Sequence, residues 1–390
     1  MIRQAGFYIS PAIPDEEPRC VTLKDVQVEV EIKDVAAHTT LIQQYKNMEQ
    51  NAVEVVYCFP LEESAAVCGF EIETDGRTIK GVAEEREKAF KIYDKAIQDG
   101  DAAYLLDQEA QDILIISVGN IKHGQEVTVR IFYVSELPVV DGVIRLQIPT
   151  TVSPRYVPAT EDPVKADRIT PPYTTGVPYK FGINVRILSK QVIEITSPSH
   201  AINVSHKGSY TIVTLAEGHT NLDRDFIAEI ATAQSEEPVC IIAAHENGQK
   251  AALVRFYPSF DNFAEKFDIK SEVIFVLDCS GSMEGSSIRK ATEARKRMRI
   301  FTFGIGYGAS HHLTKGVARA TGGVCEMIQP GEKIQPKVLR QFARLNQPFI
   351  SNIKLEFTGA DVELPAEYPP LFEGDSYTVM VKVNDAKLIK

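Results

Sequence analysis

The sequence lacks the features that mark several large classes of protein. Its 390 residues include no tryptophan and no run of eighteen apolar residues, and the first ten residues have no apolar signal-peptide core. These absences exclude a transmembrane helix and predict a cytoplasmic protein without a membrane partner. A net charge of −11 argues against a nucleic-acid partner, and the densest Lys/Arg cluster, at residues 295–299, lies on a short predicted helix that also carries Glu293.

Cysteine and histidine are also too sparse for the common catalytic and zinc-binding arrangements. The six cysteines are spread singly with no Cys-x-x-Cys, which predicts reduced, mostly buried thiols rather than a disulfide framework or a zinc site. The eight histidines are scattered, and Cys279 occupies the first glycine position of what would otherwise be a G-x-S-x-G nucleophile motif. The sequence therefore predicts a protein that is not an enzyme.

Alternation with period two dominates the first third of the chain. Residues 26–32 place Val and Ile on one face and Gln and Glu on the other, which predicts a half-buried antiparallel strand. Residues 53–59 continue the pattern, and residues 69–79 predict a hairpin because they turn at Asp75-Gly76. Two more strands, joined by a short turn, are expected at residues 113–118 and 127–133.

The period changes to that of a helix between residues 83 and 98. Apolar and charged side chains lie on opposite faces of this segment, and Gly100 stands where a helix C-cap is expected. The apolar stripe consists of Ala89, Phe90, Tyr93, Ala96 and Ile97. We therefore expect one amphipathic helix within the β-rich first domain.

The remaining chain predicts a second β unit followed by an α/β unit. Within residues 138–268, short strands follow a Pro-rich connection and are separated by turns, as in a sandwich. Residues 273–277 form a continuous apolar run, as a strand buried on both faces requires. Strands and helices then alternate to residue 345, and period-two alternation returns at 353–357 and 376–383.

Asp278-Cys-Ser280-Gly-Ser282 is the most informative stretch, because it follows the apolar run and opens a helix. Ligand sites in open α/β sheets lie at the carboxyl ends of strands, where this turn can aim one carboxylate and two hydroxyls at one point. Oxygen ligands of this kind suit Mg²⁺. A plain helix N-terminus capped by Ser282 accounts for the same residues, and the motif alone leaves both interpretations open.

Gly304-Ile-Gly306-Tyr-Gly-Ala309 suggests a competing function. It lies between a strand and a helix and loosely fits the dinucleotide fingerprint G-x-G-x-x-G/A, with Glu326 at about the right distance downstream. In dinucleotide folds this turn usually follows the first strand of the block, whereas here it follows the second. That position favours a tight turn whose glycines only permit close packing.

Two blocks of the sequence resemble known domains. Tyr57-Cys-Phe-Pro-Leu-Glu-Glu-Ser-Ala-Ala-Val-Cys-Gly-Phe-Glu71, with the helix that follows it and residues 111–119 and 127–137, resembles the vault/inter-alpha-trypsin (VIT) domain. Asp278-Cys-Ser-Gly-Ser-Met283 and two segments near Phe301 and Gly316 resemble the von Willebrand factor A (vWA) domain. The combination is most similar to the cytoplasmic vWA domain-containing 5A/5B type. More distantly it resembles the inter-alpha-trypsin inhibitor heavy chains and the vault poly(ADP-ribose) polymerase.

The resemblance implies that Asp278, Ser280 and Ser282 are three of the five ligands of a metal-ion-dependent adhesion site (MIDAS). In that site Mg²⁺ captures an acidic side chain of a partner protein. The Thr and second Asp that complete it are not identifiable, because the vWA pattern is shortened between residues 294 and 299. We therefore expect Mg²⁺ binding to be weak or absent. A short isoform, an incomplete gene model and an engineered deletion all fit this gap.

The expected architecture is multi-domain. It comprises a β-rich VIT domain with one helix at 1–137, a discontinuous β-sandwich at 138–268 and 351–390, and an inserted α/β (Rossmann-like) vWA domain, internally truncated, at 269–350. The expected function is a non-enzymatic, cytoplasmic scaffold that binds a partner protein. The alternatives are a dinucleotide-binding enzyme that uses the Gly304–Ala309 turn and a secreted, matrix-associated heavy-chain-like protein.

Overall fold

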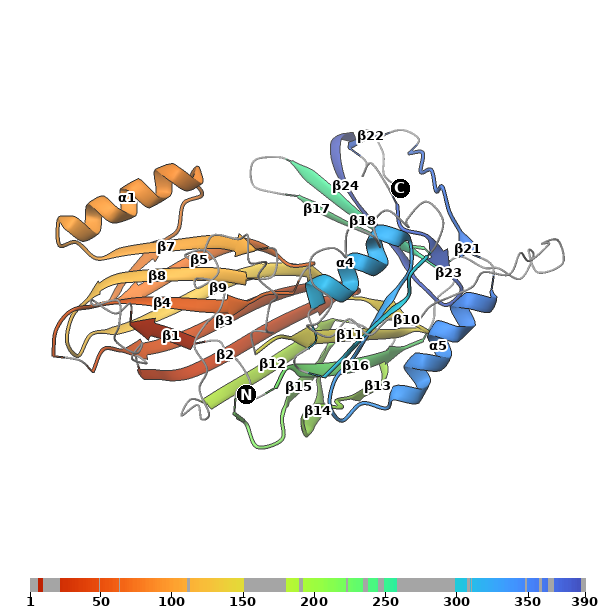
Figure 1. Ribbon diagram of the computed structural model, residues 1–390, viewed down its shortest axis with the longest axis horizontal. Coiled ribbons are helices and arrows are strands. Elements are labelled where there is room, and N and C mark those ends of the chain that lie inside the picture. Colours follow the sequence, from red (N-terminus) through yellow and green to blue (C-terminus); the bar gives the residue numbers. More distant parts are fainter. Residues whose placement is uncertain are drawn as a thin grey trace.

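The computed structural model describes residues 6–9, 22–150, 180–257 and 299–386, apart from gaps at 49, 63, 111–112, 189–191, 222–223, 234–237, 245–248, 307–308, 310, 348, 358–359 and 364–367. Within these residues strands dominate, and three helices accompany six separate sheets (Figure 1). The β-rich, multi-domain class predicted from the sequence is confirmed at this level.

The sheet with the most strands among the described residues has eight, in the order β14-β15-β12-β2-β3-β9-β5-β6. Its strands are β14 (Ile202–Lys207), β15 (Tyr210–Leu215), β12 (Lys180–Leu188), β2 (Thr22–Lys33), β3 (Ala36–Lys46), β9 (Glu126–Glu136), β5 (Ala66–Thr74) and β6 (Arg77–Lys80). The pairing of β2 with β12 is parallel and joins strands from both sides of residue 137. Asp75 and Gly76 have φ values of 49° and 70°, which confirms the predicted hairpin turn between β5 and β6.

Two four-stranded sheets share a core with the eight-stranded sheet. One has the order β1 (Gly6–Ile9), β4 (Val53–Pro60), β8 (Ile113–Ile121), β7 (Ala103–Ala110). The other has the order β10 (Val139–Val140), β11 (Val143–Ile148), β16 (Phe226–Thr232), β13 (Val192–Thr196). A single apolar cluster draws on strands of all three sheets, including Val28, Ile116, Leu146 and Phe226. The apolar core therefore includes residues from both sides of residue 137, where the sequence predicts the end of the first domain.

Helix α1 (Arg86–Gln98) covers the outer face of β7, as Figure 1 shows at the upper left. The predicted apolar stripe is confirmed, because Tyr93 is buried and its four apolar neighbours on the stripe pack with it against Ala103 and Leu105. Gly100 has φ +82°, and the N–H groups of Gly100 and Asp101 donate to the carbonyls of Ile97 and Ala96. This is the C-cap that Gly100 predicts.

A further four-stranded sheet joins distant parts of the chain, in the order β17 (Val239–Ala244), β18 (Lys250–Phe256), β24 (Tyr377–Ala386), β22 (Ala360–Glu363). β18 and β24 pair antiparallel from Lys250↔Val383 to Phe256↔Tyr377. The strand predicted at 353–357 is wrong, since this segment forms no ladder. Its alternation has another cause, because Ile353, Leu355 and Phe357 pack against the apolar face of the sheet.

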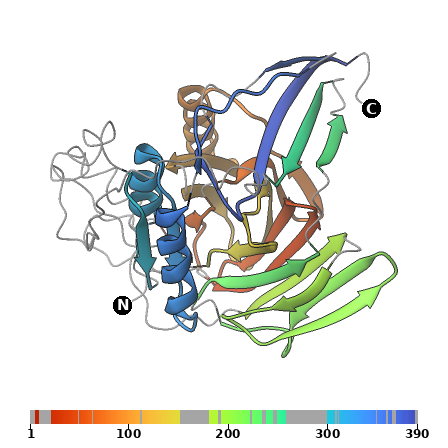
Figure 2. The same cartoon turned by 90° about the vertical axis from the view of Figure 1, so that its right-hand side faces the viewer.

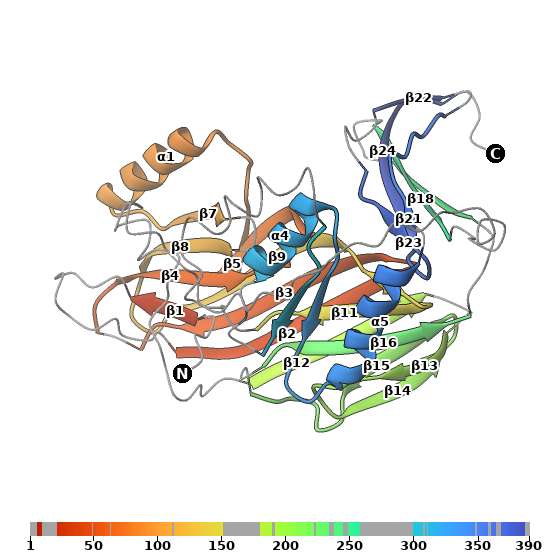
Figure 3. The same ribbon diagram turned by 45° about the vertical axis from the view of Figure 1, so that its right-hand side comes forward.

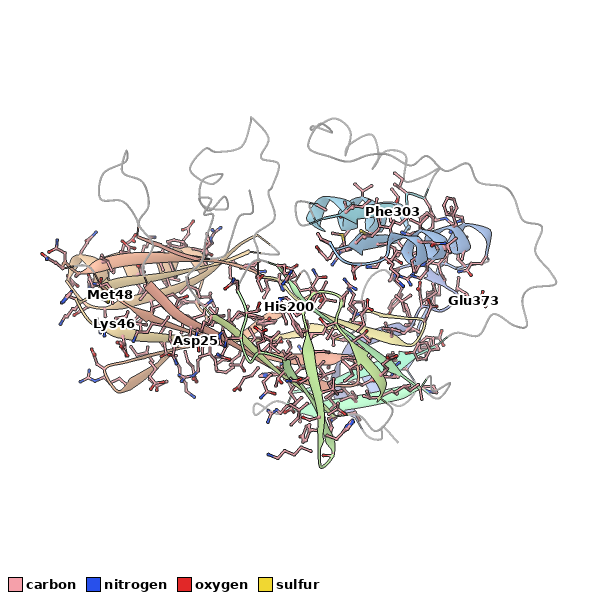
Figure 4. All side chains as sticks on the ribbon, turned by 90° about the horizontal axis from the view of Figure 1, so that it is seen from below. Asp25, Lys46, Met48, His200, Phe303 and Glu373 are labelled. Carbon is pink, nitrogen blue, oxygen red and sulfur yellow. The ribbon has the colours of Figure 1, made fainter. Side chains whose placement is uncertain are left out.

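An α/β unit lies between β18 and β24 in the sequence. It consists of β19 (Thr302–Ile305), α4 (His311–Thr321), β20 (Cys325–Ile328) and α5 (Ile334–Asn346), followed by the short pair β21 (Phe349–Ile350) and β23 (Leu371–Phe372). β19 and β20 pair in parallel, as a strand–helix–strand crossover requires. In Figure 4 its Phe303 lies in the right half of the view, whereas Lys46 and Met48 lie near the left end.

The alternation of strands and helices predicted up to residue 345 is confirmed over the described residues from 299 onward. The strand predicted at 273–277 lies outside the described residues. No helix in the part of the chain that the structure describes is long and apolar enough to span a membrane.

Gly323 tests how tightly the α/β unit is packed. A Cβ added here would overlap the backbone carbonyl of Ile300, which cannot rotate away as a side chain could. We expect Gly323→Ala to lower the free energy of unfolding by about 2–3 kcal/mol, measured by urea denaturation of the full chain.

Gly316, inside α4, is the matched control because a Cβ added there meets nothing within 4 Å. Gly316→Ala should stabilise the protein by about 0.5–1 kcal/mol through helix propensity. Equal stability of the two variants would show that the backbone before β19 yields easily.

Candidate functional site

The predicted metal ligands Asp278, Ser280 and Ser282 lie outside the described residues, so the MIDAS stays a prediction. Among the residues that the structure does describe, no group of three or more His, Cys, Asp or Glu side chains could hold a metal ion. The described part of the α/β unit instead carries a network of charged side chains, which we examine as the candidate site.

The glycine turn after β19 is a packed structural turn. Gly306 has φ +83°, and its N–H donates to the carbonyl of Ile328 at 2.9 Å, which ties the ends of β19 and β20 together. Both carboxylate oxygens of Glu326 accept hydrogen bonds from arginines, from Arg340 at 2.7 and 3.0 Å and from Arg344 at 2.8 Å. Glu326 is thus engaged within the protein, and the dinucleotide alternative is not favoured.

Helix α5 turns its basic side chains inward. Lys337, Arg340 and Arg344 follow one another at helical spacing, and the side chain of Arg344 is only 2% exposed. Arg344 also donates to Asp375 at 3.1 Å, in the turn before β24, and Arg340 lies 3.7 Å from Asp141 in the turn between β10 and β11. Ion pairs therefore connect helix α5 to the turn before β24 and to the turn between β10 and β11.

The loop between β20 and α5 docks on the sheet of β11 and β16. Glu332 accepts hydrogen bonds from Lys337 at 2.8 Å and from Arg145 of β11 at 2.5 Å, and Arg145 also binds Glu229 of β16 at 2.9 Å. Figure 3 shows α5 lying beside β11 and β16. Burial works to raise the pKa of Glu332, but Arg145, Lys337 and the Gln329 N–H outweigh it and hold that pKa below its usual value.

Glu62 brings the segment after β4 to the same region. Burial raises the pKa of its carboxyl to about 7, and the opposing charges of Lys315 on α4 and Arg145 on β11 only partly offset the effect. We call Glu62, Arg145, Glu229, Lys315, Glu332 and Lys337 the charged junction. It connects β4, β11 and β16 with the α/β unit.

Sequence reasoning missed the charged junction. Its members are more than 80 residues apart in places, such as Glu62 and Arg145, and each one alone looks like an ordinary surface charge. One signal was present in the basic spacing of Lys337, Arg340 and Arg344, which marks a single helix face. The spacing does not say whether that face is buried or solvated.

Comparison with known proteins identifies the first domain. Residues 23–133 match the family model of the "Vault protein inter-alpha-trypsin domain". The chain therefore carries a VIT domain, as the residues from Tyr57 to Glu71 predict.

The relatives of the chain confirm the predicted resemblance. Protein mono-ADP-ribosyltransferase PARP4 of Homo sapiens is 30% identical over 312 residues, which are 76% of this chain and 18% of PARP4. The von Willebrand factor A domain-containing protein 5A of Homo sapiens is 25% identical over 463 residues, covering 86% of this chain and 58% of that protein. The chain thus spans less than two thirds of either relative.

Solved structures resemble the chain only slightly. An M1 zinc metallopeptidase from Deinococcus radiodurans superposes with a TM-score of 0.29 at 8% identity, over 64% of this chain and 47% of the peptidase. A likeness this low supports no conclusion about fold or function.

Arg344 tests the contribution of the buried network around α5. Replacing it removes the ion pair with Asp375 and leaves Glu326 with Arg340 alone, and breaking a buried pair costs about 3–5 kcal/mol. We expect Arg344→Met to lower the free energy of unfolding by this amount in urea denaturation. The control is Arg186→Met, which removes an exposed pair with Glu31 at 3.1 Å and should cost less than about 1 kcal/mol.

Glu62 makes stability depend on pH in a defined direction. Its pKa is about 7 in the folded protein and near 4.5 in the unfolded chain, so the folded state binds the proton more tightly. The contribution of Glu62 to stability is therefore greatest below pH 4.5, falls as pH rises and is lowest above pH 7. Glu62→Gln should stabilise the protein by about 2–3 kcal/mol more at pH 8 than at pH 5.

The measurement is urea denaturation of the full chain at both pH values. Glu217→Gln, at an exposed turn, is the control and should give the same difference from wild type at pH 5 and pH 8. A Glu62→Gln difference that is equally flat would contradict a raised pKa at the charged junction.

Proposed function

We propose that this protein is a non-enzymatic protein-interaction module of the VIT–vWA type, located in the cytoplasm. The observation that carries the proposal is the VIT match at residues 23–133. The relatives named for a vWA domain support the second half of the assignment, because they align with 86% of the chain or more, in Homo sapiens and Rattus norvegicus.

The α/β unit is, in this proposal, the remaining part of a vWA domain within residues 269–350. Its parallel strands β19 and β20 and its two helices fit a Rossmann-like origin. The antiparallel pair β18–β24 supports an inserted position, because it joins the strands that flank the unit. Residues 138–268 and 351–390 would then form one discontinuous β domain behind a VIT domain at 1–137.

The alignment with the 5A protein supports an internal deletion. It spans 463 positions, which exceeds the 390 residues of this chain, so part of the aligned region of that relative has no counterpart here. A shortened vWA domain explains why only Asp278, Ser280 and Ser282 of the MIDAS can be named. In the proposed site they would offer one carboxylate and two hydroxyls to Mg²⁺, and the acidic side chain of a partner would supply another oxygen.

Isothermal titration with Mg²⁺ tests the incomplete site. With three of five ligands, we expect wild type to bind in the millimolar range or not at all, and Asp278→Ala to behave the same. Asp94→Ala, at an exposed position on α1, is the control for a general loss of negative charge. Micromolar binding that disappears in Asp278→Ala but not in Asp94→Ala would show that the site is complete.

A titration with NAD(H), followed by thermal shift, separates the proposal from the dinucleotide alternative. We expect no change in unfolding temperature, because both oxygens of Glu326 are engaged with Arg340 and Arg344. Saturable binding would favour an enzyme.

A further inference from the structure

The outer strand β17 lacks the devices that protect sheet edges. Edge strands expose unpaired backbone N–H and C=O groups, and proteins usually guard them with charges, prolines or bulges. In the part of the chain that the structure describes, three edge strands have six or more residues, namely β7, β14 and β17. β7 carries Asp107 and an irregular register after Gln108, and β14 carries His206 and Lys207.

β17 has the sequence Val-Cys-Ile-Ile-Ala-Ala, with no charge and no proline. It pairs with β18 in unbroken register from Val239↔Arg255 to Ala244↔Lys250. Figure 2 shows β17 on the outer margin of its sheet, beside β18. Its free edge is therefore a regular, uncharged template for another strand.

An apolar row of side chains continues to this edge, and no described strand or helix pairs with β17 on its outer side. Ile242 pairs with Ala252 and Ala252 with Val381, so the three side chains share one face of the sheet. Val381 is 2% exposed and Ala252 3%, but Ile242 is 46% exposed. Cys240, two residues away on the same face, is exposed as well. The apolar face thus ends in solvent at β17.

We propose that β17 pairs antiparallel with β17 of a second copy of this chain, which makes a two-fold symmetric dimer with one continuous eight-stranded sheet. Antiparallel pairing of a strand with itself is what a two-fold axis perpendicular to the sheet generates. Each copy carries a net charge of −11, so most faces of two copies repel each other. This repulsion weakens the dimer, but the six residues of β17 carry no charge, and a second copy supplies an equally uncharged strand whose exposed Ile242 covers the end of the apolar row.

Side-chain parity restricts the register of this pairing. Directly opposed residues must point to the same face, so the axis passes through a residue near the centre of β17. With the axis at Ile241, Cys240 faces the partner subunit's Ile242. With the axis at Ile242, that side chain faces the partner subunit's Ile242. Both registers bury Ile242, the exposed end of the apolar row.

Analytical ultracentrifugation of the full chain tests the dimer. We expect a monomer–dimer equilibrium in the micromolar range, and at least tenfold weaker association for Ile242→Lys, which places two like charges at the interface. The matched control is Val204→Lys, since Val204 lies on the edge strand β14 and is 43% exposed. Val204→Lys should associate like wild type. Wild type that remains monomeric at 200 µM, or association that Ile242→Lys leaves unchanged, would overturn the proposal.

A cross-linking variant gives an independent result. Opposed residues in antiparallel pairs have Cα atoms about 4.5–5.5 Å apart, which is within the range for a disulfide. In either register Ile242→Cys places the introduced thiol opposite Cys240 or opposite its own copy. Mild oxidation should therefore give a covalent dimer that dithiothreitol reverses. Val204→Cys should remain monomeric, and equal cross-linking of both variants would mean random collision and would contradict pairing through β17.

Discussion

The antiparallel pairing of β18 with β24 is the constraint on which the C-terminal part of the structure depends. Phe256 at the end of β18 lies opposite Tyr377 at the start of β24, so the chain between them must leave and return at neighbouring points. The whole α/β unit lies within this segment of the chain, between Phe256 and Tyr377. The entropic cost of closing such a loop grows only slowly with its length, so the sheet tolerates a long insertion or a shortened one.

The pairing of β18 with β24 fixes where the α/β unit begins and ends but does not determine its orientation. The ion pairs made by helix α5 determine that orientation. Lys337, Arg340 and Arg344 bind Glu332, Glu326, Asp141 and Asp375, which come from the unit itself and from two turns outside it. Ion pairs of this kind add little net stability compared with an apolar contact, but they are costly to break. The network therefore selects one orientation of the unit more than it strengthens the fold.

The outer face of α5 shows the consequence of this arrangement. Ile334, Leu339 and Phe342 are 49%, 59% and 54% exposed, whereas Lys337, Gln341 and Arg344 are buried. The usual rule that the apolar stripe of a helix faces the core is thus reversed. Charge complementarity outweighs apolar burial here, because Arg344 pairs with both Glu326 and Asp375 and Arg340 pairs with Glu326 as well.

The sequence predicts elements well where a local pattern determines them. The α1 stripe, the Asp75-Gly76 turn, the Gly100 cap and the strands β2 and β4 follow from spacing alone. Which strands pair is harder to predict, because alternation with period two indicates that a strand is half buried but does not indicate which strand lies beside it. β8 and β9 follow one another through a short turn, yet they lie in different sheets, and β2 pairs with β12 from beyond the Pro-rich connection.

The candidate site shows the same limit. The sequence marks Glu326 as an acidic residue at a plausible distance from a glycine turn. Only the fold shows that its carboxylate forms ion pairs with Arg340 and Arg344. The pKa of Glu62 depends on its burial, which raises it, and on the charges of Arg145 and Lys315, about 80 and 250 residues away along the chain, which lower it; no local pattern encodes either effect. Residues 353–357 misled for a related reason, since alternation records which side chains face the core whether or not the backbone joins a sheet.

The carboxyl ends of β19 and β20 differ in how exposed they are, and this difference bears on partner binding. The end of β20 is closed, because Gln329 is 4% exposed and Glu332 is bound to Arg145 of the neighbouring sheet. The end of β19 is open, with Ile305 60% exposed beside Gly306. Ligand sites of open α/β sheets lie at these carboxyl ends. In the proposed interaction module, a partner that binds this part of the α/β unit would therefore approach on the side of β19, since among the described residues the charged junction already occupies the side of β20.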